Sequence, residues 1–334
     1  MVRGWMLGAG LAAALALAGA ALAEPPAEIA AKIRASGQAM DASVMAMYAP
    51  LHPKPPYTGV TVVRDLAYGT DPLQKLDVFA PPNAAGATRP VVIFVHGGGF
   101  VRGDKHGNAD SPFEDNHPLW AARNDMVGVN INYRLAPKDP YPAGAADLAS
   151  AIAWARANAA RYGGDPGKIY IWGHSAGANH VADYVAHTEL HIGPRGGVAG
   201  AIIQSATYAD SRVEGVTPLR AGSAGNGLPA TAVPVTAPPT NAYYGADQSL
   251  WSAEASLARM EKSQIPMLLA YAEFDPPGFQ SYMRRLNDTL VKAGKPPRAL
   301  LLLKGHNHFS EGAMIGTSDD SLTGPMLSFI RSGR

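Results

Sequence analysis

Ser175 is the residue of this sequence best placed for nucleophilic chemistry. It stands at the centre of Gly173-His174-Ser175-Ala176-Gly177, between the apolar run 168–172 and a stretch of small and apolar residues at helical spacing. A serine at a sharp turn from strand to helix adopts a strained backbone, and its neighbours must be small because other segments approach closely. The turn lifts the hydroxyl clear of the sheet, and the N–H groups of the following helix face any negative charge that forms there. The pattern therefore predicts a serine nucleophile.

A serine nucleophile also needs a base and an acid that orients the base. The hydroxyl is protonated at neutral pH, so a histidine must lie within hydrogen-bond reach of Ser175. His306 and His308 both follow the last predicted strand, where a loop can return to the serine. Glu273 and Asp275 follow the preceding strand, and either can supply the acid. The chain order serine, acid, histidine is that of the α/β-hydrolase arrangement.

A run of three glycines supplies donors for a developing oxyanion. His96-Gly97-Gly98-Gly99-Phe100 comes directly after the apolar run 91–95. Glycines at the end of a buried strand can turn their N–H groups toward a substrate oxygen with no side chain in the way. Together with the N–H of Ala176, they would surround a carbonyl oxygen as it becomes charged. We expect His96 to shape this loop through hydrogen bonds.

The elements that must position these residues alternate between strands and helices. Helices are predicted at 143–162, from 177 onward, at 278–293 and at 321–331, and strands at 91–95, 126–131, 168–172, 198–204, 265–271 and 299–303. This order predicts a doubly wound, mostly parallel sheet with helices on both faces. The segments 60–66 and 76–79 flank a turn cluster and predict an antiparallel pair at the N-terminal edge. Arg134 and Asp147 are expected to form a structural ion pair before the helix at 143–162.

Two N-terminal segments and one internal insertion do not belong to this alternation of strands and helices. Residues 1–23 resemble a cleaved signal peptide, with a cleavage site after Ala23, although a retained membrane anchor is the alternative reading. Residues 27–49 predict one amphipathic helix, within an N-terminal segment 24–58 that is either a packing element or part of a lid. Residues 59–334 then form the main domain. Its Pro- and Gly-rich insertion at about 211–260 is interpreted as a flap over the site, or else as a plain surface insertion.

The motifs in combination resemble one family. His96-Gly97-Gly98-Gly99-Phe100, Asn132-Tyr133-Arg134-Leu135-Ala136-Pro137 and Gly173-His174-Ser175-Ala176-Gly177 look like the marks of α/β-hydrolase carboxylesterases of the hormone-sensitive-lipase type. Gly-Asp-Lys at 103–105 and His-Phe-Ser at 308–310 look closer to the related feruloyl-esterase-like bacterial group. The resemblance implies an eight-stranded twisted sheet and the following roles: Ser175 as nucleophile, Asp275 as acid, His308 as base, and Gly98, Gly99 and Ala176 as oxyanion donors. Pro277 stands where this family usually has Leu.

We therefore expect an exported serine hydrolase, periplasmic or secreted, that cleaves small carboxylic esters without a cofactor. An amide or peptide hydrolase of the same fold, such as an arylformamidase, and a binding protein on a hydrolase scaffold are the alternatives. His174 and Tyr208 are candidate substrate contacts. A formal charge of +1 gives no support to nucleic-acid binding, and no stable membrane insertion is expected after signal cleavage. The chain has no cysteine, and His306-Asn307-His308 has no third ligand at a recognisable spacing, so we expect no metal site.

Overall fold

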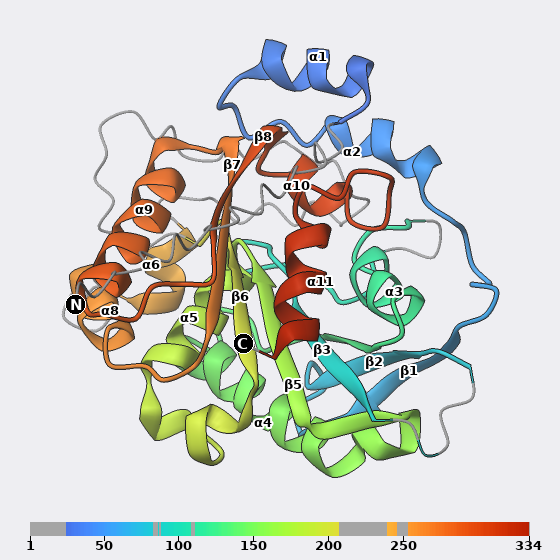
Figure 1. The fold of residues 1–334 in the computed structure, drawn as a ribbon, viewed down its shortest axis with the longest axis vertical. Helices are drawn as coiled ribbons and strands as arrows, with labels where there is room; N and C mark the ends of the chain where they lie inside the picture. The colour runs from blue at the N-terminus through green and yellow to red at the C-terminus, as the bar shows by residue number, and fades with distance from the viewer. Residues whose placement is uncertain are drawn as a thin grey trace, which may run out of the picture.

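The predicted apolar runs become the central strands of one eight-stranded sheet (Figure 1). The computed structural model describes residues 25–82, 86, 88–107, 111–206, 239–245 and 253–333. The strand order is β1-β2-β4-β3-β5-β6-β7-β8. Only β2 runs antiparallel to its neighbours, β1 and β4, and the remaining neighbours pair in parallel. This confirms the predicted fold class and its antiparallel N-terminal edge.

The strands follow the predicted segments closely, and β5 begins four residues earlier than expected. They are β1 (Thr61–Ala67), β2 (Lys75–Ala80), β3 (Arg89–Val95), β4 (Val127–Ile131), β5 (Gly164–His174), β6 (Gly200–Gln204), β7 (Met267–Phe274) and β8 (Leu300–Asn307). The helices are α1 (Ala27–Ser36), α2 (Val44–Tyr48), α3 (Asn116–Arg123), α4 (Ala143–Asn158), α5 (Ala176–Ala186), α6 (Pro239–Tyr244), α8 (Ala253–Met260), α9 (Pro277–Lys292), α10 (Ser310–Ala313) and α11 (Thr323–Ser332). Short 3-10 turns lie at Ala49–Leu51, Ala159–Tyr162, Thr188–Leu190 and Pro194–Gly197.

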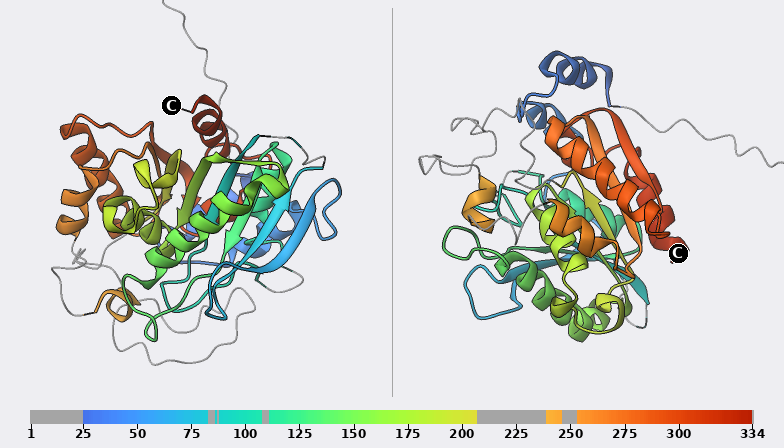
Figure 2. Two further views of the ribbon diagram at one scale, coloured as in Figure 1. Left: turned by 90° about the horizontal axis from the view of Figure 1, so that it is seen from below. Right: turned by 90° about the vertical axis from the view of Figure 1, so that its left-hand side faces the viewer.

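Alternating side chains of the central strands divide the interior into two cores. In β3, Val91 and Ile93 enter one core, whereas Val92 and Phe94 enter the other, because successive strand residues point to opposite faces. The first core lies under α4, α5, α8 and α9, and the second under α1, α2, α3, α10 and α11 (Figure 1, Figure 2). Helices therefore cover both faces of the sheet, as a parallel sheet requires.

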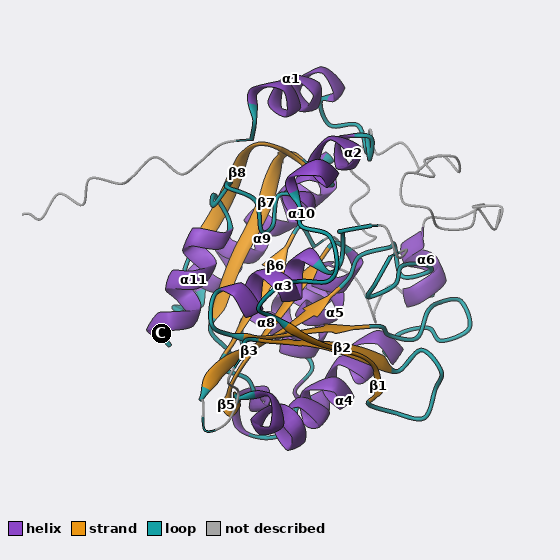
Figure 3. Ribbon diagram, turned by 90° about the vertical axis from the view of Figure 1, so that its right-hand side faces the viewer, coloured by secondary structure: helices purple, strands orange, loops and turns teal. Residues whose placement is uncertain are grey.

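The single helix expected at 27–49 is wrong, because α1 and α2 are separate helices. Gly37 has φ 55° and ψ −137°, which ends α1 after Ser36. Asp41 then organises the break: its carboxylate accepts hydrogen bonds from the hydroxyl of Ser36 (2.6 Å) and the backbone N–H of Ser43 (2.9 Å). Figure 3 shows α2 beside α10 and α1 next to the end of β8. The N-terminal segment thus packs against the part of the chain that follows β8.

Several expectations concern residues outside the described part of the chain. These are the signal segment 1–23, Tyr208, and the insertion 211–260 apart from α6, Gly245 and α8. No helix among the residues that the structure describes combines the length and apolar character needed to cross a membrane.

Candidate active site

Ser175 occupies the turn between β5 and α5 in a strained conformation. Its φ is 57° and its ψ −123°, in the left-handed region that non-glycine residues rarely adopt. A side chain at Gly173 would place its Cβ 2.3 Å from the carbonyl oxygen of Gly177. One at Gly177 would place its Cβ 2.0 Å from the carbonyl oxygen of Val95. The two glycines of the motif are therefore required by close packing around the serine.

Ser175, His308 and Asp275 form a continuous hydrogen-bonded chain. The Oγ of Ser175 lies 2.9 Å from Nε2 of His308, and Nδ1 of His308 lies 2.7 Å from Oδ1 of Asp275. Asp275 is fully buried and its second oxygen, Oδ2, accepts hydrogen bonds from Ser205 Oγ (2.6 Å) and the N–H of Ala272 (2.8 Å). Bonding to Asp275 places the N–H of His308 on Nδ1, which leaves Nε2 free to accept the serine proton.

The other candidates for the base and the acid lie elsewhere. His306 is buried with Nε2 3.0 Å from Oδ2 of Asp319 and Nδ1 3.2 Å from the hydroxyl of Ser310, so it braces the loop. Glu273 is exposed and accepts a hydrogen bond from the N–H of Gly305 at 2.8 Å. The side chain of Glu273 thus turns outward to β8, and Asp275 is the acid that contacts His308.

The glycine loop after β3 lies directly against the serine. A Cβ on Gly97 would be 3.1 Å from the Cβ of Ser175. Gly98 and Gly99 have φ values of 128° and 62°, conformations that glycine adopts without strain. Ala176 follows Ser175, begins α5 and is buried. The structure therefore places the glycine loop and the start of α5 next to the nucleophile, and the roles of Gly98, Gly99 and Ala176 as oxyanion donors stay a prediction.

Residues at the end of β3 and directly after β4 hold the glycine loop in place. His96 is buried, its Nδ1 lies 2.7 Å from the carbonyl oxygen of Gly97, and its ring stacks on Tyr133 at 4.5 Å. The hydroxyl of Tyr133 donates a hydrogen bond to the carbonyl oxygen of His96 at 3.0 Å. The expected ion pair of Arg134 with Asp147 forms at 2.7 Å and fixes the segment after β4. His96 therefore acts on the loop, as expected from the sequence.

Phe100, at the end of the loop, is clamped by aromatic side chains. It has φ 70°, is 3% exposed and stacks on Tyr243 with ring centroids 4.8 Å apart. Tyr244 contacts the same ring edge-on at 5.6 Å, and its hydroxyl donates to Asp183 at 2.9 Å. Tyr243 and Tyr244 are thus buried in the core next to the glycine loop.

His174 lies beside the base. Its ring centroid is 4.7 Å from that of His308, and its Nε2 is 3.0 Å from Oε1 of Glu311. Burial lowers the pKa of His174 to about 4, so this imidazole is neutral at physiological pH. The polar contact of this ring is thus with the buried side chain of Glu311.

Two residues of the site, Ser205 and Glu311, were not predicted. Ser205 follows β6 just as Ser175 follows β5, and its position at the carboxyl end of the adjacent strand was the signal available in the sequence. Glu311 belongs to the one-turn helix α10, which no periodicity indicates. The donor atoms of His174, His308 and Glu311 lie within 4.8 Å of one another, a grouping that could suit a metal ion. Nδ1 of His308 is already bonded to Asp275, so we assign the group to hydrogen bonding.

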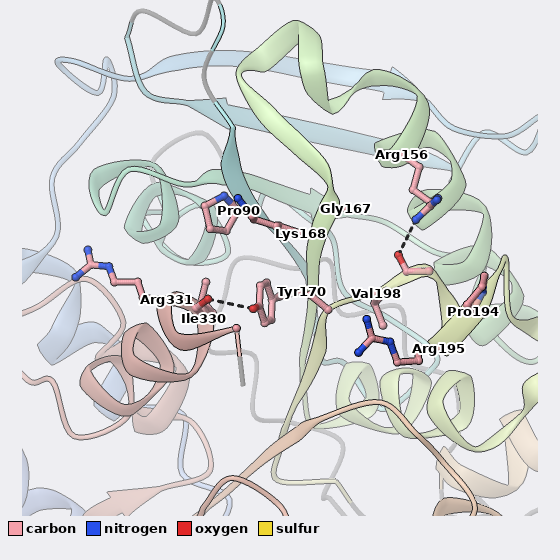
Figure 4. Close-up of a pocket in the computed structure, with 13 residues that line it drawn as sticks. Pro90, Arg156, Gly167, Lys168, Tyr170, Pro194, Arg195, Val198, Ile330 and Arg331 are labelled. Carbon is pink, nitrogen blue, oxygen red and sulfur yellow. Dashed lines mark hydrogen bonds between the residues drawn. The ribbon is translucent and has the colours of Figure 1, made fainter.

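A cavity of about 620 Å³ lies at the opposite ends of the strands (Figure 4). It is bordered by the start of β5, by the segment before β6 and by the end of α11. Its charged lining residues are all basic: Arg156, Lys168, Arg195 and Arg331. Because it holds no nucleophile with an adjacent base, this cavity is not the reaction site.

Comparison with solved structures identifies the fold. Fungal esterases from Rhizomucor miehei superpose with a TM-score of 0.63 and 22% identity, covering 92% of each chain. An arylesterase superposes with a TM-score of 0.58 and 21% identity, covering 87% of each chain. The chain has the α/β-hydrolase fold. Within this fold, the family model BD-FAE matches residues 76–192, which hold the glycine loop and Ser175.

The sequence relatives are similar to this chain over a limited length. Carboxylesterase NlhH of Mycobacterium tuberculosis is 44% identical over 92 residues, 27% of each chain. Phenmedipham hydrolase of Pseudarthrobacter oxydans is 37% identical over 113 residues, 32% of this chain and 22% of that protein. The alignments thus span about a quarter of the length of these relatives.

Proposed function

We propose that this α/β-hydrolase cleaves carboxylic esters through a covalent acyl-enzyme formed on Ser175. The observation that carries the proposal is the chain of hydrogen bonds from Ser175 through His308 to Asp275, with the glycine loop packed against the same serine. The names of the similar proteins, carboxylesterase NlhH among them, support an ester as the substrate. Residues 1–23 further support export to the periplasm or the medium.

Each residue then has a step in the reaction. Ser175 Oγ attacks the ester carbonyl carbon while Nε2 of His308 takes the hydroxyl proton. The N–H groups of Gly98, Gly99 and Ala176 stabilise the oxyanion, and each such donor contributes roughly 3 kcal/mol in the transition state. Asp275 stabilises the imidazolium, which gives its proton to the leaving alcohol. Water then attacks the acyl-enzyme with His308 again as base and releases the acid.

Reaction with a fluorophosphonate tests the nucleophile and the export of the chain together. The protein is expressed from the full-length sequence, recovered from the periplasm or the medium and treated with the reagent. Its intact mass is then measured by mass spectrometry. We expect one adduct at Ser175, located by peptide mapping, on a chain that begins at Glu24. Ser175→Ala should fold, remain unlabelled and lose p-nitrophenyl ester turnover by at least 1,000-fold, because the nucleophile is absent.

Absence of an adduct on the folded wild-type protein would refute the serine mechanism. A chain that still begins at Met1 would instead refute the cleavage of residues 1–23 and leave the esterase proposal intact.

A further inference from the structure

Glu311 is a buried carboxyl group that the proposed mechanism does not use. It lies in α10, three residues after His308, and its side chain is fully buried. Oε1 lies 3.0 Å from Nε2 of His174 and 3.8 Å from Nδ1 of His308. Oε2 has no hydrogen-bond partner among the described residues. Two carboxyl groups, those of Asp275 and Glu311, thus converge on the same nitrogen of the base.

The surroundings of Glu311 favour its protonated form. Burial, and then the charge of Asp275, raise the pKa of Glu311 well above its ordinary value. His308 and the side chains of Ser205 and Gln204 act in the opposite direction and by less. The remaining neighbour is His174, which burial keeps neutral and which has His117 behind it. A carboxylate there would be desolvated, would face a second carboxylate and would lack a partner on one oxygen. A protonated acid avoids all three costs and can donate a hydrogen bond to the neutral ring of His174.

We propose that Glu311 is a protonated positioning residue of the triad, which can ionise and orient His308 in place of Asp275 when that residue's charge is removed. The proposal rests on the proposed esterase function. In the intact protein, the proton of Glu311 would hold His174 against the ring of the base. Two carboxyl groups at such short range do not both ionise, so the charge of Asp275 adds to burial in keeping Glu311 neutral.

Removing the charge of Asp275 tests whether Glu311 can orient His308 in its place, which we call the reserve role of Glu311. Asp275→Ala should lower kcat/KM by at least 100-fold at neutral pH, and a part of the activity should return as pH rises and Glu311 ionises. The double variant Asp275→Ala, Glu311→Gln should lack this alkaline recovery and be at least 10-fold slower than the single variant at high pH. Equal pH profiles of the single and double variants would overturn the reserve role. Asp275→Asn with and without Glu311→Gln repeats the comparison should the alanine variant fail to fold.

The positioning role is tested with Asp275 in place. The amide of Glu311→Gln donates to His174 as the protonated acid does, whereas Glu311→Leu cannot. We expect the glutamine variant to keep at least 10-fold more kcat than the leucine variant, with the acid limb of its kcat/KM profile moved by less than half a pH unit. An acid limb that falls by more than one unit would show that Glu311 is ionised in the native protein, which overturns the proposal.

Infrared spectroscopy separates this proposal from the esterase proposal. A protonated buried carboxyl group gives a carbonyl stretch distinct from that of a carboxylate. Glu114 is also buried with a raised pKa, so the band of Glu311 is read from the difference spectrum between the wild-type protein and Glu311→Gln, in which it should be present. The measurement requires no turnover. Loss of the band with no ester cleaved by the wild type would overturn the proposed function alone, whereas active enzyme without the band would overturn the role of Glu311.

Discussion

At the scale of single residues, the triad acid is the most completely bonded group of the site. Asp275 uses Oδ1 for His308 and Oδ2 for Ser205 and the N–H of Ala272. These two donors hold the carboxylate in one orientation, which in turn sets the tautomer and the direction of the imidazole. Ser205 is itself held in a left-handed conformation, with φ 51°, by a backbone hydrogen bond to Ala270. Its hydroxyl is therefore a fixed part of the site.

We predict that Ser205→Ala lowers kcat roughly 10-fold with little change in KM. A hydrogen bond to a charged group is worth about 1.5–3 kcal/mol, and its loss leaves Asp275 free to turn away from His308. Steady-state kinetics on a p-nitrophenyl ester measures the effect. Ser263→Ala is the matched control, because Ser263 is also buried but bonds the N–H of Ile265. A kcat of Ser205→Ala equal to that of the control would show that Ser205 does not position the acid.

At the scale of elements, the site is a set of loops at the carboxyl ends of adjacent parallel strands. β3 leads into the glycine loop, β5 into Ser175, β6 into Ser205, β7 into Asp275 and β8 towards His308. Parallel pairing in register brings these ends to one edge of the sheet, where ligands bind in such folds. The backbone of the glycine loop is closely packed. A side chain on Gly98 would place its Cβ 2.0 Å from the carbonyl oxygen of Arg102.

Gly98→Ala is predicted to lower kcat/KM by about 100-fold or more. The methyl group would force the loop away from Arg102, and φ 128° is strained for alanine, so at least one oxyanion donor would leave its place. Kinetics and a thermal melt on the same samples separate lost turnover from lost folding. Gly107→Ala, later in the same loop, meets only ordinary contacts of 3.4 Å and longer, and it should keep near-native turnover. Similar losses in both variants would contradict a specific role of Gly98.

At the scale of the whole molecule, neutral histidines are built into the interior. His180 on α5 is fully buried between Phe100, Tyr133 and Tyr243, and burial lowers its pKa to about 3. Neither ring nitrogen has a partner among the described residues. The unfolded chain therefore takes up a proton near pH 6.5, whereas the folded chain does not until about pH 3. The free energy of unfolding thus falls as pH falls from 6.5 towards 3, and His180 causes no such loss above pH 6.5.

His180→Leu should flatten the dependence of unfolding free energy on pH. One buried neutral imidazole lowers the free energy of unfolding by roughly 2 kcal/mol between pH 6.5 and pH 5. The variant lacks this imidazole, so its free energy of unfolding should not fall by this amount, whatever its value at neutral pH. Denaturant titrations at pH 7, 6 and 5 give the slope. Val181→Ala, a buried change on the same helix, should lower stability equally at each pH and keep the wild-type slope. An unaltered slope in His180→Leu would mean that His180 is charged in the folded protein.

The central strands were predicted well from the sequence. An apolar run such as 91–95 places apolar side chains on both faces of a strand, and this is favourable only where helices cover both faces of the sheet. Ser175 and the glycine loop were also predictable, since their backbone conformations demand particular small residues. The break between α1 and α2 was missed, because it depends on hydrogen bonds of Asp41 that interrupt an otherwise helical apolar pattern. Glu311 was missed for a similar reason: its burial and its contact with His174 are tertiary facts that no local pattern encodes.

The position of β8 at the edge of the sheet determines how the protein can lose its activity. This strand is the last in the sheet order, and within the described chain β7 is its only strand neighbour. The base follows its end, whereas Ser175 follows β5 at the centre of the sheet. Fraying of one edge would therefore separate base from nucleophile while the middle of the molecule stayed intact. Turnover therefore depends on the order of the β8 edge, and the protein can lose its activity while most of the chain remains folded.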